Sequence, residues 1–385
     1  MVAEASRTTK AKIGTLAIDN FRALQRLTVS GLGRVNLITG RNNTGKSSLL
    51  EALRILASNG SPFVVSDILQ YREEDLREAD DSGRPLDLEG AFPFGTLFNG
   101  FPSFATNIAP IVIATNDGSK PMRLSISAEW LFEERDDTGI RKLVPRQIGL
   151  FGGDEAVNGV PSLVFEAAGF RRQFPLDYMW RRRYESLSRR EPLDEAGLPW
   201  QFVNAYGGER TVTLAALWDK AALNSREQDV VEALRIIDPR ISGVLMVGGE
   251  TPRRSRTAVV RATHLPRPVP LRSFGDGLNR LFGIVVSLVN AKDGILLVDE
   301  FENGMHYTVQ LDAWRAVFKL SRLLDVQVFA TTHSWDSIEA FQKAAAESPE
   351  DGAIVRLARK GDAIVPTVFA EVELAIATRE RIEVR

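Results

Sequence analysis

The sequence contains no cysteine among its 385 residues, which excludes disulfide bonds and thiolate metal sites. It has only three histidines, and its 48 Lys and Arg nearly balance its 50 Asp and Glu, so no bulk charge favours a nucleic acid or a membrane surface. No hydrophobic run is long enough to cross a bilayer, the most apolar stretch being 281–289. Residues 1–12 lack the apolar core of a signal peptide. These absences predict a cytoplasmic protein with no membrane partner, in which nucleic-acid binding would be confined to a local patch.

Apolar residues make up 44% of the chain, enough for a sizeable core, and they follow α/β periodicity near both ends. Two short alternating segments at 13–29 precede an apolar strand at 35–39, a glycine-bounded loop and a helix at 47–57. The pattern of the last third predicts a helix after Gly277, a strand at 294–298 and a helix at 309–324. A strand at 326–330 and a terminal hairpin at 354–368 follow.

The middle of the chain is less regular, with predicted strands at 122–132, 243–247 and 257–262 and a helix at 226–237. No sustained heptad repeat is present, which argues against a long coiled-coil arm. We therefore predict an α/β protein with a mixed β-sheet. Its expected parts are an N-terminal lobe at 1–57, a large α+β insertion or arm with a helical subdomain at 58–264, and a C-terminal lobe at 265–385.

The loop between the strand at 35–39 and the helix at 47–57 matches the phosphate-loop pattern at every fixed position. Its glycines allow backbone N–H groups to turn toward phosphates, Lys46 can reach the β- and γ-oxygens, and the Ser47 hydroxyl can ligate Mg²⁺. The sequence thus predicts a site for ATP and Mg²⁺. The expected nucleotide-binding residues of this loop are Gly40, Asn42, Asn43, Thr44, Gly45, Lys46, Ser47 and Ser48.

An apolar strand ends in two adjacent carboxylates, Asp299 and Glu300. Phosphoryl transfer to water needs a ligand for magnesium and a group that orients or deprotonates the attacking water. We predict that Asp299 holds the metal and that Glu300 acts on the water. A strand that ends in an exposed acidic turn would have the same two residues, but the position of this pair in a chain with a phosphate loop favours the catalytic interpretation.

A second segment with the features of an anion-binding helix start contains Ser273, Gly275, Asp276 and Gly277. One nucleotide does not need two phosphate cradles from one chain, so this segment predicts a dimer in which it serves the neighbouring subunit. An ordinary capped helix is the alternative. His333 ends the strand at 326–330, where α/β folds place ligand-contacting residues, and it could donate a hydrogen bond to the γ-phosphate.

With these motifs in this order, the chain resembles the ABC-type ATPase heads of the SMC, RecF and OLD (overcoming-lysogenization-defect) group. The resemblance also includes Asn20-Phe21-Arg22 and covers 1–57 and 265–385. It is most similar to stand-alone OLD-like ATPases, through Asp-Glu-Phe-Glu-Asn-Gly-Met-His at 299–306 and Thr-Thr-His-Ser-Trp-Asp at 331–336.

The resemblance implies an ABC-type P-loop head that hydrolyses ATP as a homodimer or a higher homo-oligomer. Ser273 and Gly275 of one head would contact the γ-phosphate that Lys46 of the other head binds, and Arg22 would join the nucleotide site. The loop at 302–306 would cross the dimer interface. Two features depart from the family pattern. The signature segment reads Ser-Phe-Gly-Asp-Gly and not the transporter-like Ser-Gly-Gly-Gln, and the sequence does not place a magnesium-contacting glutamine loop, for which Gln70 is a candidate.

OLD nucleases carry a TOPRIM nuclease domain after the ATPase, but only 52 residues follow His333 and they contain no Asp-x-Asp pair. The chain is therefore similar to the ATPase subunits of two-component phage-defence systems, and the resemblance implies a separate effector, a TOPRIM-like nuclease.

Three other hypotheses remain open: a RecF-like DNA repair protein, the nucleotide-binding subunit of a transporter, and a small-molecule kinase. Arginines and aromatic residues at 171–190, and arginines at 253–256, form either a nucleic-acid patch or an ordinary solvated surface.

Overall fold

The structure is a computed structural model. It describes residues 11–74, 94–102, 108–118, 121–135, 141–146, 160–176, 197–205, 211–248, 256–348 and 351–369.

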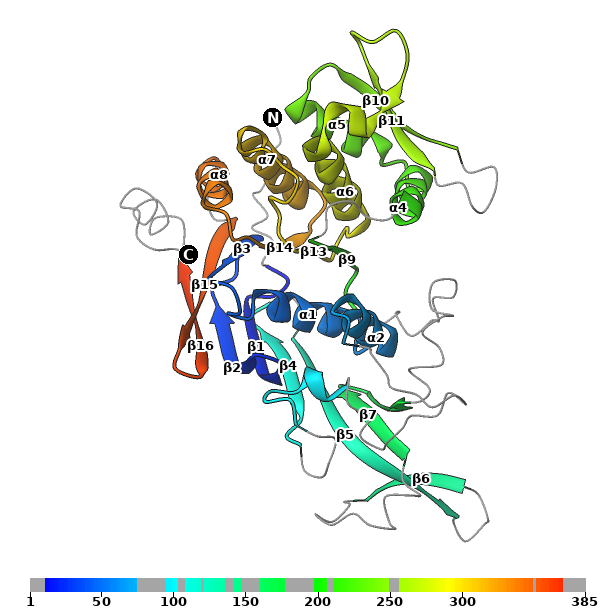
Figure 1. Ribbon diagram of the computed structural model, residues 1–385, viewed down its shortest axis with the longest axis vertical. Coiled ribbons are helices and arrows are strands. Elements are labelled where there is room, and N and C mark those ends of the chain that lie inside the picture. The colour runs from blue at the N-terminus through cyan, green and yellow to red at the C-terminus, as the bar shows by residue number, and fades with distance from the viewer. Residues whose placement is uncertain are drawn as a thin grey trace, which may run out of the picture.

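The centre of the fold is a sheet of six described strands in the order β16-β15-β3-β14-β13-β9 (Figure 1). Neighbouring strands from β9 to β15 run parallel, and only β16 is antiparallel to its neighbour. The strands are β3 (Val35–Thr39), β9 (Trp200–Val203), β13 (Ile295–Val298), β14 (Gln327–Thr331), β15 (Gly352–Lys360) and β16 (Ala363–Phe369).

Every residue of the strands β3, β13 and β14 is buried because both faces of the sheet are covered. Alternate residues of β13 belong to different cores. Leu296 and Val298 pack with the helices on one face, and Ile295 and Leu297 pack with α1 on the other. The helices on the first face are α6 (Asp276–Asn290), α7 (Tyr307–Leu323) and α8 (Trp335–Ala346), and α1 spans Lys46–Ala57.

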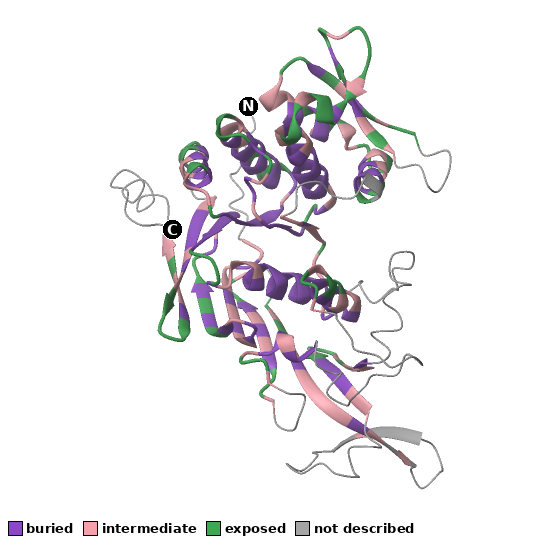
Figure 2. Ribbon diagram, viewed as in Figure 1, coloured by how far each residue is buried: buried purple, intermediate pink, exposed green. Residues whose placement is uncertain are grey.

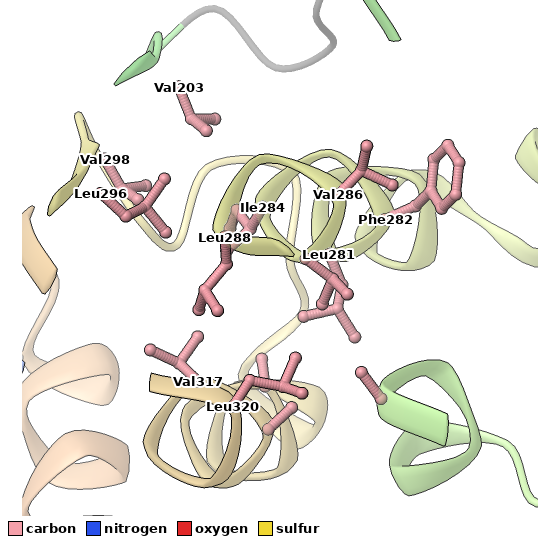
Figure 3. Packing of buried hydrophobic residues seen from close by; sticks show 14 of the residues in the cluster. Val203, Leu281, Phe282, Ile284, Val286, Leu288, Leu296, Val298, Val317 and Leu320 are labelled. Atoms are coloured by element: carbon pink, nitrogen blue, oxygen red, sulfur yellow. The ribbon is translucent and has the colours of Figure 1, made fainter. Parts of the chain in front are cut away.

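Helix α6 is largely buried, and the burial colours mark it together with the central strands (Figure 2). Leu281 and Leu288 of α6 point toward Val317 and Leu320 of α7, while its other side faces the ends of β9 and β13 (Figure 3). This packing places the start of α6 in a fixed relation to the carboxyl end of β13.

A second, antiparallel sheet lies beyond α1, which packs between it and the central sheet. Its order is β2-β1-β4-β5-β7-β8, with β6 paired to β5. The strands are β1 (Thr15–Phe21), β2 (Leu24–Ser30), β4 (Ile111–Asn116), β5 (Met122–Arg135), β6 (Arg141–Arg146), β7 (Val160–Ala167) and β8 (Phe170–Pro175). Helix α2 (Pro62–Tyr71) contacts α1.

A third, small sheet with the order β10-β11-β12 lies near α6 together with two further helices. These elements are α4 (Thr211–Leu223), α5 (Glu227–Ile237), β10 (Ile241–Val247), β11 (Thr257–Ala262) and β12 (Val269–Pro270), followed by the short 3₁₀ helix η5 (Leu271–Phe274).

The α/β class and the helices and strands predicted at both ends are confirmed. The described parts of the segment 58–264, which we expected as an insertion or arm with a helical subdomain, contribute to three sheets. Its β4–β8 strands extend the sheet that β1 and β2 begin, its β9 strand joins the central sheet beside β13, and its α4 and α5 helices pack on α6. Hydrogen bonding to strands far away in sequence distributes this segment over all three sheets.

Candidate nucleotide site

The phosphate loop connects β3 to α1 and has the backbone that anion binding requires. Gly40 has a φ of 140°, and a Cβ there would overlap the carbonyl oxygen of Leu357 in β15. Gly45 has a φ of 84°, and a Cβ there would lie 2.7 Å from a methyl group of Leu24. Both positions accept only glycine without strain. Neighbouring strands therefore press against the loop and fix its shape.

Hydrogen bonds within the loop hold it in a closed form. Lys46 Nζ donates to the carbonyl oxygens of Gly40 at 2.7 Å and Arg41 at 3.0 Å, and Thr44 Oγ1 donates to the Arg41 carbonyl at 2.8 Å. From outside the loop, Arg359 Nη2 of β15 donates to the Asn43 carbonyl at 3.2 Å. The motif did not point to Arg359, because this contact depends on the pairing of β15 with β3.

The electrostatics of Lys46 connect the phosphate loop to the acidic strand end. Burial lowers the pKa of Lys46, and the nearby carboxylates of Asp299, Glu300 and Glu302 oppose that shift. The structure therefore brings together the lysine and the two acids that the sequence predicted, and it adds Glu302. Asn42 and Asn43 are exposed on this loop, Ser47 is partly buried, and Ser48 is buried in α1.

The two acids at the end of β13 differ in environment. Asp299 is 7% exposed, and its Oδ1 accepts a hydrogen bond from Thr331 Oγ1 at 2.6 Å. The Glu300 side chain is 40% exposed, and its backbone has a φ of 48°. The Glu300 N–H donates to the same Thr331 hydroxyl at 2.8 Å. A buried carboxylate thus lies next in sequence to a carboxylate that is accessible to water.

His333 lies next to these acids, as expected from its position after β14. Its Nδ1 is 3.2 Å from Glu302 Oε1 and 3.7 Å from Glu300 Oε1, and its side chain is 55% exposed. Its backbone N–H also donates to Glu302 Oε1 at 3.1 Å. Glu300 Oε2 accepts from Asn303 Nδ2 at 3.2 Å. Asn303 and the buried Glu302 contact Glu300 and His333, and the motifs had predicted no chemical role for either of them.

The predicted signature segment lies at the start of α6. Gly275, with a φ of 101°, joins η5 to the helix, and Ser273, Gly275 and Asp276 are exposed. A Cβ on Gly277 would lie 3.6 Å from the Gly304 carbonyl oxygen, so the loop after Glu300 packs against the first turn of α6.

Arg22 lies in an internal charge network. Its Nε is 2.8 Å from Glu51 Oε2, and its two terminal nitrogens donate to Glu74 at 2.8 and 2.9 Å. Only 4% of the Arg22 surface is exposed. Burial raises the pKa of Glu51, while Arg22 and Arg72 act in the opposite direction. Arg22 is thus held beside α1, and Gln70, the glutamine-loop candidate, is exposed at the end of α2.

Two family models match the two halves of this site. Residues 12–136 match "AAA ATPase domain", and residues 228–338 match "AAA domain, putative AbiEii toxin, Type IV TA system". The fold is similar to that of a solved SMC head bound to the C-winged helix domain of ScpA, with a TM-score of 0.50, 11% identity and coverage of 94% of this chain and 99% of that one. These matches show that the chain is an ATPase whose fold is similar to that of SMC heads.

The ATPase head is also similar to curated proteins. A Helicobacter pylori protein described as an ATP/GTP phosphatase is 23% identical over 360 residues, which cover 87% of this chain and 89% of the relative. An uncharacterized Methanocaldococcus jannaschii protein, MJECL10, is 40% identical over 65 residues, only 16% of this chain and 30% of that protein. The SMC head domain from Thermotoga maritima aligns with a TM-score of 0.45 and 10% identity, over 93% of this chain and 99% of that one.

The structure describes only part of the arginine-rich segments, and it also bears on the expected absence of a membrane span. Of the arginine patch, most of 171–190 and of 253–256 lies outside the described residues. Arg171 is described, and it pairs with Glu129 and Glu166 on the second sheet, as in an ordinary charged surface. Among the residues that the structure describes, no helix of the ATPase head has the length and apolarity needed to span a bilayer.

Proposed function

We propose that this ATPase head works as an ATP-driven switch in which two copies enclose two nucleotides. One observation carries the proposal: the signature segment at Ser273 and Gly275 is exposed on the α6 side, while the phosphate loop lies at the end of β3 next to its own catalytic acids. Helix starts with free N–H groups favour anions. A second head placed face to face would bring its signature segment to the γ-phosphate and complete each site.

Within each site, the loop residues from Gly40 to Ser48 would surround the phosphates and Lys46 would leave its own loop carbonyls to pair with the β- and γ-oxygens. Glu300 would orient and deprotonate the attacking water, and His333 would donate a hydrogen bond to the γ-phosphate. Arg22 would reach the nucleotide only after leaving Glu74.

Magnesium fits the donor set of this site. The Ser47 hydroxyl and the Asp299 carboxylate are the hard oxygen donors that Mg²⁺ prefers, and phosphate oxygens supply its other ligands. The described residues contain no group of three His, Cys, Asp or Glu side chains that could bind a metal without the nucleotide. When bound, the ion neutralises the charge that develops on the phosphates.

The test compares ATP hydrolysis and mass in solution for the native chain and three variants. We expect Glu300→Gln to lose activity by roughly 10²–10⁴-fold, because it removes the base, and to accumulate as an ATP-dependent dimer. Lys46→Ala and Ser273→Arg should remain monomeric with ATP.

The matched control is Ser242→Arg, an exposed serine on β10 away from the site, which should dimerise and hydrolyse normally. Normal hydrolysis by Glu300→Gln, or normal dimerisation of Ser273→Arg, would refute the composite site and favour a monomeric phosphotransferase.

We further propose that the switch controls a separate effector in the cytoplasm, a TOPRIM-like nuclease in antiviral defence. The support is the motif resemblance to OLD-like heads and the match at 228–338 to a model that carries a toxin–antitoxin description. The test is phage challenge of cells that express this chain with and without the neighbouring gene. Protection that needs both genes and is lost with Lys46→Ala supports the proposal.

A DNA-binding role in repair is the alternative outcome of the same study. If the isolated chain binds duplex DNA with a steep salt dependence, and phage challenge shows no protection, the repair hypothesis replaces the effector model. The SMC-like fold is compatible with both, because a fold does not fix a function.

A further inference from the structure

Arg280 is a buried arginine that the motifs do not explain. It lies in α6, one turn after Asp276, and is 3% exposed among apolar neighbours. A buried guanidinium is costly unless its N–H groups find acceptors. Its acceptors are main-chain carbonyl oxygens of two other segments, and this choice of partners indicates a role beyond packing.

The Arg280 guanidinium contacts the backbone at the catalytic end of the sheet. Its Nη2 donates to the carbonyl oxygens of Asp299 at 2.8 Å and Glu300 at 3.0 Å, and its Nη1 donates to the carbonyl oxygen of Asn204 at 2.6 Å. Asn204 follows β9, the strand beside β13. The Arg280 side chain of α6 thus contacts the backbone of both acidic residues and the residue that follows β9.

Thr331 makes the corresponding contacts from the other side. Its hydroxyl donates to Asp299 Oδ1 at 2.6 Å and accepts from the Glu300 N–H at 2.8 Å. The Thr331 carbonyl also accepts from the Phe301 N–H at 3.0 Å. Asp299 and Glu300 are therefore held by a side chain of α6 on one side and by the end of β14 on the other.

This support is needed because Glu300 has an unusual backbone. Its φ of 48° lies in the left-handed region, which is unfavourable for residues other than glycine. Such a residue keeps this conformation only when the surrounding structure imposes it. Hydrogen bonds to its N–H and its carbonyl oxygen impose that conformation. The direction of the Glu300 carboxylate thus depends on Thr331 and Arg280.

We propose that Arg280 and Thr331 are positioning residues for Glu300, and that Arg280 couples the signature segment to the catalytic base. The inference rests on the proposed role of Glu300. Helix α6 begins at the segment that would contact the neighbouring head's nucleotide, and a shift of the helix moves the Arg280 guanidinium with it. Docking of the second head would therefore align Glu300, so that hydrolysis follows assembly.

The test uses two variants that keep the volume of each side chain. Arg280→Lys keeps the charge but lacks the fork that spans three carbonyls, and Thr331→Val replaces the hydroxyl by a methyl group. We expect kcat to fall by roughly 10–100-fold, as misplaced catalytic groups do. KM, and the affinity for a non-hydrolysable ATP analogue, should stay within about twofold of native, because these contacts act on the chemical step.

Three controls separate positioning from a general structural effect. Thr331→Ser keeps the hydroxyl and should restore most of kcat. Arg322→Lys, on an exposed arginine paired with Asp351, should leave kcat unchanged. Combined with Glu300→Gln, each positioning variant should still form the ATP-dependent dimer at native protein concentrations, and thermal unfolding should report intact folding.

Native kcat in both Arg280→Lys and Thr331→Val, with an inactive Glu300→Gln, would overturn this inference and leave the proposed function standing. An equal loss of kcat and nucleotide affinity would also overturn it, since that pattern marks a structural role. Normal hydrolysis by Glu300→Gln would instead remove the proposed function on which the inference rests.

Discussion

At the scale of single residues, the phosphate loop depends on glycines whose backbone is incompatible with a side chain. Gly40 has a φ of 140°, and a Cβ added there would overlap the Leu357 carbonyl oxygen and lie 2.8 Å from Thr44 Oγ1. The pattern in the sequence identified this glycine, but the partner on β15 follows only from the sheet. The loop is therefore shaped by the C-terminal hairpin as well as by its own sequence.

We predict that Gly40→Ala weakens nucleotide binding. Residues held in such backbone regions cost about 1–3 kcal/mol each, and relief of that strain would displace the loop, so we expect affinity to fall by roughly 10–100-fold. Equilibrium binding of a fluorescent ATP analogue measures the change. Gly361→Ala is the control, because its φ is 62° but nothing lies within 4 Å of the added carbon. Equal losses in both variants would contradict the argument.

At the scale of elements, local patterns predicted the strands and helices that surround the site. The run of apolar residues in β13 and the helical spacing in α1 are local signals of burial. By contrast, β9 is only four residues long and pairs with β13 across more than ninety positions, which no local pattern encodes. Arg280 was missed for the same reason, because its carbonyl partners belong to other elements.

The contact between α7 and the loop that follows Glu300 gives a prediction at this scale. The Trp314 ring stacks on Phe301 with centroids 3.6 Å apart, and both residues are fully buried. We expect Trp314→Ala to lower the free energy of unfolding by about 3–5 kcal/mol. It should also slow hydrolysis, because Phe301 directly follows Glu300. Urea unfolding and steady-state kinetics measure the two effects.

The control for this prediction is Leu323→Ala on the same helix, whose side chain is 63% exposed. Surface substitutions of this kind change the free energy of unfolding by less than about 0.5 kcal/mol. If Trp314→Ala changes the free energy of unfolding as little as Leu323→Ala does, the aromatic stack does not stabilise the loop that follows Glu300.

At the scale of the whole molecule, the proposed dimer divides each composite site between two copies of the chain. Symmetry then requires that every dimer contain two sites, each with the phosphate loop of one head and the signature segment of the other. This arrangement distinguishes a dimeric switch from a monomeric enzyme. In a monomer, a defect at Lys46 and a defect at Ser273 could not complement each other.

We therefore predict that two inactive variants regain activity when mixed. In a dimer of Lys46→Ala with Ser273→Arg, one site carries both defects and the other carries neither. Because neither variant should dimerise with ATP on its own, the dimers that form are mixed and have one intact site of two, so we expect up to about half of the native activity per head. Phosphate release from the mixture, compared with each variant alone at the same total concentration, measures it. The recovered activity should fall on dilution, because it requires two chains. A mixture as inactive as its components would show that Lys46 and Ser273 do not serve opposite sides of one shared site.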